Sequence, residues 1–100
     1  MNPAQSDVAT PHASRYLSQL LKHFAHKLPV EMEEGSGRIA FPAGVCSLAA
    51  EPDVLHMRVD AVDDAECGRL MNVVERHLVR FAFRETLSVD WRTAAWSTEP

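Results

Sequence analysis

Apolar side chains recur with a helical spacing between Thr10 and Lys27, where the sequence reads TPHASRYLSQLLKHFAHK. At about 100° per residue they fall on one stripe, which is typical of a helix that lies on a core. The members of this stripe are Ala13, Leu17, Leu20, Leu21, Phe24 and Leu28. Thr10 is the predicted N-cap, Pro11 occupies the first helical position, and Pro29 ends the helix.

Beyond Pro29 the pattern changes to alternation of apolar and polar residues, which indicates strands with one buried face. Alternating segments are found at 7–9, 30–33, 38–50, 54–60 and 87–92. A turn is expected at 35–37, between the second and third of them. Within the third, the alternation slips by one residue at 42–44, and a slip of this kind requires a bulge or a tight turn.

A second amphipathic helix is predicted from Asp63 or Asp64 to about Ala82, and Glu66 completes a capping box with Asp63. Its buried stripe is Cys67, Leu70, Met71, Val74, Leu78 and Phe81. The opposite side carries arginines, at Arg69, Arg76, Arg80 and the nearby Arg84. A solvated face, neutralised by neighbouring glutamates, explains them best, and the alternative is a surface for an acidic partner or a flavin phosphate.

Two helices and about five strands, each with one apolar face, predict a two-layer α+β sandwich. Both helices would pack on one face of a mostly antiparallel sheet, in the order β-α-β-β-β-α-β. A chain of 100 residues has the size of a single domain. We expect one domain over 1–100, with an ordered core at about 7–92 and flexible termini, the last of which contains Trp96.

Composition removes several classes of function. A net charge of −4 argues against nonspecific binding to nucleic acid, which needs a dense basic surface. The chain shows neither an apolar run of roughly 20 residues nor a signal peptide, so we expect no membrane association and a cytoplasmic location. Cys46 and Cys67 are too far apart for a CxxC pair, and we expect both to be reduced, buried thiols.

Three stretches resemble the bacterial domain-of-unknown-function family DUF2218: TPHASRYLSQLLKHFAHK, GRIAF with Gly44 and Cys46, and ERHLVRFAFRETLSVDW. The resemblance runs from Val8 to Trp91. It implies a small cytoplasmic α+β domain without an established activity, and it transfers no catalytic residues. Some relatives occur beside or fused to siderophore-interacting flavin reductases, so the resemblance also implies a role in iron handling.

The far side of the first predicted helix carries polar residues that core packing does not require. They are His12, Ser14, Arg15, Gln19, His23 and His26. A solvated helix face is the simplest explanation of this set. Two binding chemistries remain open beside it, one at each end of the helix.

His23 and His26 are three residues apart and could share a metal ion, because imidazoles at this spacing lie side by side. His12 is about 16 Å from them along the helix axis. A third ligand would have to come from Gln19, from another segment or from a second molecule. At the helix start, His12, Ser14 and Arg15 could bind a phosphate or carboxylate next to the free amides.

The sequence contains no GxSxG, GxGxxG, phosphate-loop or HExxH motif. We therefore expect a noncatalytic binding or accessory domain. The resemblance to DUF2218 implies that it acts with a flavin-dependent or siderophore iron-uptake protein. Its contact surface would be the polar face of the first helix. The alternative is a metal- or anion-binding protein that uses the same histidine-rich face. The sequence does not specify a cofactor.

Overall fold

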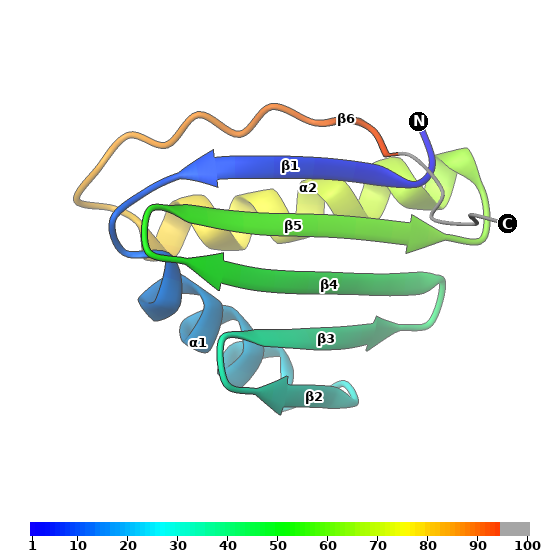
Figure 1. Cartoon of the computed structure of the whole chain (residues 1–100). Coiled ribbons are helices and arrows are strands. Elements are labelled where there is room, and N and C mark those ends of the chain that lie inside the picture. Colours follow the sequence, from blue (N-terminus) through cyan, green and yellow to red (C-terminus); the bar gives the residue numbers. More distant parts are fainter. Residues whose placement is uncertain (95–100) are drawn as a thin grey trace, which may run out of the picture.

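The computed structural model describes residues 1–94, which form a six-stranded antiparallel sheet and two helices (Figure 1). The elements are β1 (Ala4–Ala9), α1 (Ala13–Phe24), β2 (Val30–Glu33), β3 (Ser36–Phe41), β4 (Gly44–Glu51), β5 (Val54–Ala61), α2 (Asp64–Phe81) and β6 (Arg92–Thr93). Strands lie in the order β2-β3-β4-β5-β1-β6, and each neighbouring pair is antiparallel.

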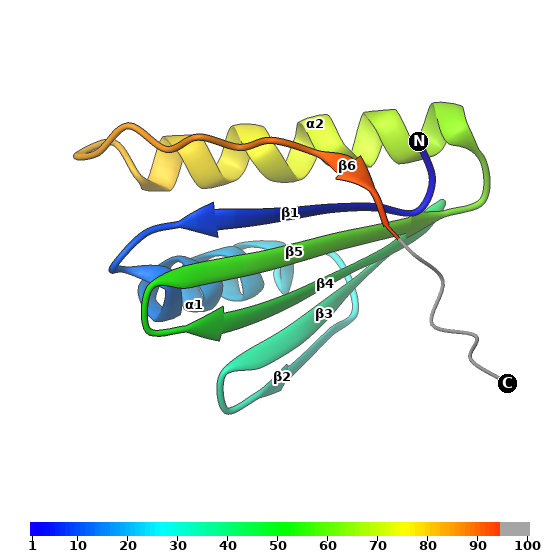
Figure 2. The same cartoon turned by 45° about the horizontal axis from the view of Figure 1, so that its top comes forward.

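Both helices cover the same face of the sheet, which leaves the other face open (Figures 1 and 2). This confirms the predicted α+β sandwich. The core between the layers contains Leu20 and Leu21 of α1, Ile39 and Met57 of the sheet, and Leu78 of α2. Burying a side chain of this size stabilises the fold by about 1.5–3 kcal/mol.

The sheet has one strand more than the predicted order, because the segment at 38–50 is a hairpin. A two-residue turn at 42–43 separates β3 from β4, and Phe41 pairs with Gly44. The slip in the alternation is therefore a tight turn, after which inward side chains again face the helices. The preceding turn is also shorter than predicted: it consists of Glu34 and Gly35, whose φ is +81°, and β3 already begins at Ser36.

Gly37 lies in β3 and not in the turn where the sequence placed it. It is buried, and a Cβ atom there would collide with the side chain of Leu21 and lie 2.8 Å from the carbonyl oxygen of Glu31. The glycine is needed because α1 crosses this strand closely.

The first and last strands differ most from their predicted bounds. β1 begins at Ala4, three residues before the predicted start at position 7. The sequence did not indicate this extension, because the inward positions Ala4 and Ser6 are small or polar and give no apolar signal. The predicted strand at 87–92 is paired only at its end, where Gln5 lies opposite Arg92. The inward side chains of this segment nevertheless pack on the core. It leans toward α2, and the indole Nε1 of Trp91 donates a hydrogen bond of 2.9 Å to Glu75. Trp96 lies outside the described residues.

Helix ends follow the capping chemistry in part. Asp63 accepts a hydrogen bond of 2.8 Å from the backbone N–H of Glu66, as predicted. α1 begins at Ala13, three residues after Thr10, whose hydroxyl accepts a hydrogen bond from the N–H of His12. It ends at Phe24, before Lys27, because the chain tightens into turns from residue 25. Within residues 1–94, neither helix combines the length and apolar character that a bilayer crossing requires.

Candidate functional site

The six predicted residues of the first helix are all exposed, but the structure places five of them in two separate hollows. His12, Arg15 and Gln19 line one hollow near the start of α1. His23 and His26 line another at its end. Ser14 lies on the surface and lines neither of these two. The histidine face is therefore not one continuous site.

The first of these, which we call the Glu85 hollow, has a volume of about 320 Å³ and lies between the two helices. Its lining comes from α1 and from the end of α2 with the turn beyond it: His12, Arg15, Tyr16, Gln19, Phe81, Phe83, Arg84 and Glu85. Figure 1 shows the start of α1 and the end of α2 at the same end of the sheet. The sequence did not predict this second half of the lining.

Glu85 occupies the centre of a small hydrogen-bond network. Its carboxylate accepts a 2.5 Å hydrogen bond from the hydroxyl of Tyr16 and a 3.1 Å bond from that of Thr10. The bond from Tyr16 is the main cause that lowers the pKa of Glu85. Burial, reinforced by the carboxylate, raises the pKa of Tyr16 to about 12. The acid therefore stays ionised and the phenol stays protonated at neutral pH.

Positive charge predominates around this network. Arg15 and Arg84 contribute two guanidinium groups against one carboxylate, and His12 adds a third cation when it is protonated. The first turn of α1 contains no acidic residue, so the positive end of the helix dipole is not offset there. Phe81 and Phe83 supply apolar walls, and the guanidinium of Arg84 lies 5.3 Å from the ring centre of Phe83. An anion with a flat apolar part fits this chemistry.

The second hollow, at the end of α1, is mostly apolar and measures about 480 Å³. The His23 ring on its rim does not point freely into solvent, because it lies 4.8 Å from the ring of His77 on α2. Partial burial, followed by nearby positive groups that include His77, lowers the pKa of His23. Within residues 1–94, no cluster of three His, Cys, Asp or Glu side chains is placed to hold a metal ion.

His77 was not among the predicted site residues, although its position carried a signal. His77 follows Leu70 by seven residues and Val74 by three, and it precedes Phe81 by four. This spacing places it beside the apolar stripe of α2, where a polar ring would not be expected without a partner. The residue pattern on the exposed face of one helix does not show a pair that forms between two helices.

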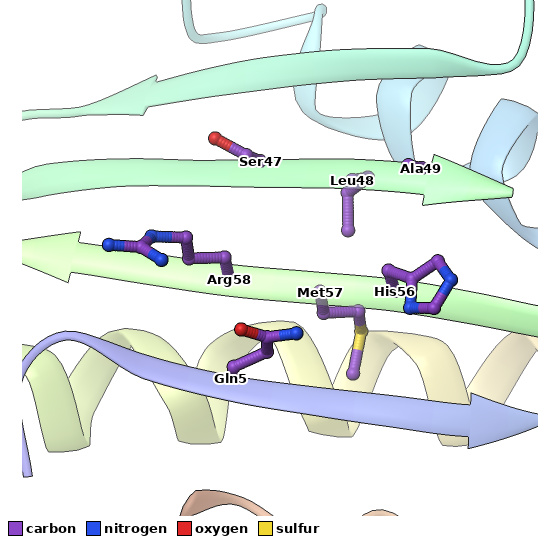
Figure 3. Close-up of a pocket in the computed structure, with 7 residues that line it drawn as sticks. All are labelled: Gln5, Ser47, Leu48, Ala49, His56, Met57 and Arg58. Atoms are coloured by element: carbon purple, nitrogen blue, oxygen red, sulfur yellow. The ribbon is translucent and has the colours of Figure 1, made fainter. Parts of the chain in front are cut away.

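The open face of the sheet carries a third hollow, of about 190 Å³ (Figure 3). His56 and Arg58 project on this face beside Gln5 and Ser47 (Figure 3). Both imidazole nitrogens of His56 face carboxylates, with Nδ1 at 2.7 Å from Asp7 and Nε2 at 3.4 Å from Glu51.

Other charges on the open face are paired in the same way. Arg92 reaches the second oxygen of Asp7 at 2.6 Å, and Arg58 pairs with Asp60 at 2.9 Å. The hydrogen bond from His56 lowers the pKa of Asp7 to about 2, and the same bond raises the pKa of His56. These groups satisfy one another, so this face is a weaker candidate site than the Glu85 hollow.

Comparison with known proteins agrees with the fold but supplies no activity. An NMR structure of PA4090 from Pseudomonas aeruginosa is similar, with a TM-score of 0.78 and 37% sequence identity; the match covers 92% of this chain and 96% of that one. No curated protein matches the sequence. The profile of DUF2218, described as an uncharacterized protein conserved in bacteria, matches residues 5–92. The chain therefore belongs to the DUF2218 family.

Proposed function

We propose that this protein is a noncatalytic binding module whose ligand is a small organic anion bound in the Glu85 hollow. The observation that carries the proposal is the convergence of Arg15, from α1, and Arg84, from the turn beyond α2, on one hollow that also has two phenylalanine walls. Its volume of about 320 Å³ lies at the lower end of the range typical of small-molecule sites.

Each group in the hollow has a role suited to binding. A guanidinium can donate two parallel hydrogen bonds to a phosphate or a carboxylate, and His12 adds a donor beside the start of α1. Phe81 and Phe83 would contact a flat apolar part of the ligand. Glu85 already accepts hydrogen bonds from Tyr16 and Thr10, and these bonds reduce its repulsion of an anion. The arginines keep their charge at all relevant pH values. A permanent charge suits the binding of an anion, whereas acid–base catalysis needs a group that gains and loses a proton.

Two ligand classes follow when the sequence resemblance is added. The resemblance implies that some relatives occur beside or fused to siderophore-interacting flavin reductases. A flavin phosphate and a ferric siderophore are therefore the first ligands to test. A flavin phosphate and a ferric siderophore of the catecholate class both combine negative charge with aromatic rings. In this proposal the protein is an accessory in siderophore or iron metabolism, acts in the cytoplasm, and presents the ligand or the polar face of α1 to a protein partner.

The test is a titration of the purified full chain at pH 7 and low salt with inorganic phosphate, flavin mononucleotide and a ferric catecholate siderophore. Calorimetry and thermal shift provide the readouts, because a ligand that binds only the folded state raises Tm. We expect R15Q and R84Q each to weaken binding by about tenfold, the loss of one charge-assisted contact. R76Q is the matched control, since Arg76 is exposed on α2 outside the hollow.

Two results would contradict the proposal. One is the absence of binding by all three probes. The other is binding that R15Q and R84Q leave as strong as in the R76Q control, which would place the ligand elsewhere.

A further inference from the structure

Two histidines from different helices meet beside the second hollow. The ring centres of His23 on α1 and His77 on α2 are 4.8 Å apart, and the ring planes are inclined by 46°. The core fixes both helices on the sheet, so the pair is held by tertiary structure and not by a flexible loop. Neither histidine lines the Glu85 hollow, although the ring of His23 lies 5.7 Å from that of Phe81, one of the walls of that hollow.

A hydrogen bond within α2 determines which nitrogen of the neutral His77 ring carries the proton. Its Nδ1 lies 2.7 Å from the carbonyl oxygen of Val73, one helical turn earlier. A carbonyl oxygen only accepts hydrogen bonds, so Nδ1 carries a proton, and in the neutral ring Nε2 is the nitrogen with the free lone pair. A backbone carbonyl that orients an imidazole in this way is the usual support of a metal-binding histidine.

The distance between the rings fits a shared ion. Zinc and similar metals bind imidazole nitrogen at about 2.0–2.1 Å, which places two ring centres roughly 4.5 Å apart at a right angle and about 5.2 Å apart at a tetrahedral angle. The observed 4.8 Å falls between these values. The separation of the two rings is therefore compatible with one shared ion.

We propose that His23 and His77 form a two-imidazole site for a divalent first-row transition metal ion. Cu²⁺ should bind most tightly among these ions, as expected for nitrogen ligands. Water or a small ligand completes the coordination, since residues 1–94 supply no cluster of three ligating side chains. The sequence left open whether a further ligand for a metal at His23 comes from another segment, and in this proposal that ligand is His77 of α2.

The surroundings define the character of the site. Phe24 packs against both rings, at 5.1 Å from His23 and 4.9 Å from His77, and limits their rotation. Lys27 and Arg80 lie near enough to affect His23 electrostatically, and their positive charge opposes a cation. We therefore expect a site of modest affinity that cross-links α1 to α2 and raises Tm when it is filled.

The test uses the untagged full chain, titrated with Cu²⁺ in a weakly coordinating buffer. We expect one ion per chain, an electron paramagnetic resonance spectrum that shows coupling to two nitrogens, and a rise in Tm. H23Q and H77Q should each weaken Cu²⁺ binding by about tenfold or more, because each removes one of two protein ligands. H26Q, H12Q and H56Q are the matched controls, and each should stay within about twofold of wild type.

Wild-type protein provides a second test that does not depend on the variants folding. In side-chain NMR spectra, substoichiometric Cu²⁺ should broaden the imidazole signals of His23 and His77 before those of the other three histidines. Broadening that begins at His26, His12 or His56 would overturn the proposal. It would also be overturned if folded H77Q bound Cu²⁺ as tightly as wild type, or if H26Q lost as much affinity as H23Q. The anion-binding proposal is tested separately, with R15Q and R84Q and with anionic probes, so its failure and the failure of the metal site are distinguishable.

Discussion

The hydroxyl of Tyr16 donates a 2.5 Å hydrogen bond to the carboxylate of Glu85, 69 residues further along the chain. This bond joins α1 to the turn beyond α2, and both of its residues line the Glu85 hollow. Because the phenol is only 4% exposed, its proton is held by burial as well as by the carboxylate.

Tyr16 is the single tyrosine of the chain, so ultraviolet absorbance reports its ionisation directly. We expect a midpoint near pH 12 in the folded protein, against 10.0 for an ordinary tyrosine. The raised pKa stabilises the folded state fully below pH 10, and this contribution is lost as the pH rises through about 12. E85Q should lower the midpoint only in part, because burial is the larger cause. A folded protein with a midpoint near 10 would contradict the structure.

His56 should titrate above its ordinary pKa of 6.5 in NMR spectra, because Asp7 and Glu51 both stabilise its charged form. D7N should move the midpoint down further than E51Q, since the bond to Asp7 is the larger cause. The raised pKa of His56 stabilises the fold below pH 6.5. This stabilisation is lost as the pH rises through the pKa that His56 has in the folded protein.

Asp7 acts in the opposite direction, and its stabilisation is lost as the pH falls through about 2. Near pH 5 we therefore expect D7N to cost about 0.5–1 kcal/mol in urea unfolding, a value reduced by solvent screening. The exposed Asp90 provides the control, and an equal loss in D90N would count against this assignment.

Two glycines should respond oppositely to alanine. At Gly44 a Cβ atom would lie 2.5 Å from the carbonyl oxygen of Asp60 and 2.8 Å from the Cα of Ala61, so G44A must displace backbone. We expect it to lose about 1–3 kcal/mol of stability. Gly68 lies in α2 with nothing within 4 Å of its Cβ position, and G68A should gain about 0.5–1 kcal/mol. Denaturant unfolding of both variants checks the difference, and destabilisation of equal size would refute it.

Cys46 and Cys67 are both free and buried, as the sequence predicted. Burial raises the pKa of Cys46 to about 12 and raises that of Cys67 as well, so neither forms a thiolate readily. At pH 8 a thiol reagent should label them only when the protein opens, and labelling should become fast in denaturant. S47C provides a matched positive control, because position 47 faces the open side of the sheet next to Cys46. Rapid labelling of native wild type would contradict the burial.

The sequence by itself determined the two helices, most of their buried stripes, the cap at Asp63 and the two-layer α+β class; the buried Tyr16 was not predicted. These features follow from local periodicity, which records the face each residue turns to the core. The weak points were local as well. Ala4 and Ser6 are buried without an apolar signal, and the slip at 42–44 did not show by itself whether one strand or two was present.

Tertiary structure alone decided which side chains of the helices meet. The sequence placed His12, Arg15, Gln19, His23 and His26 on one face of α1, and that face is exposed. It could not show that Arg84 and Glu85 return beside Arg15, or that His77 faces His23, because these contacts join residues more than fifty positions apart. Helical spacing orders side chains around one axis, whereas the packing of two helices on a common sheet determines which side chains approach one another.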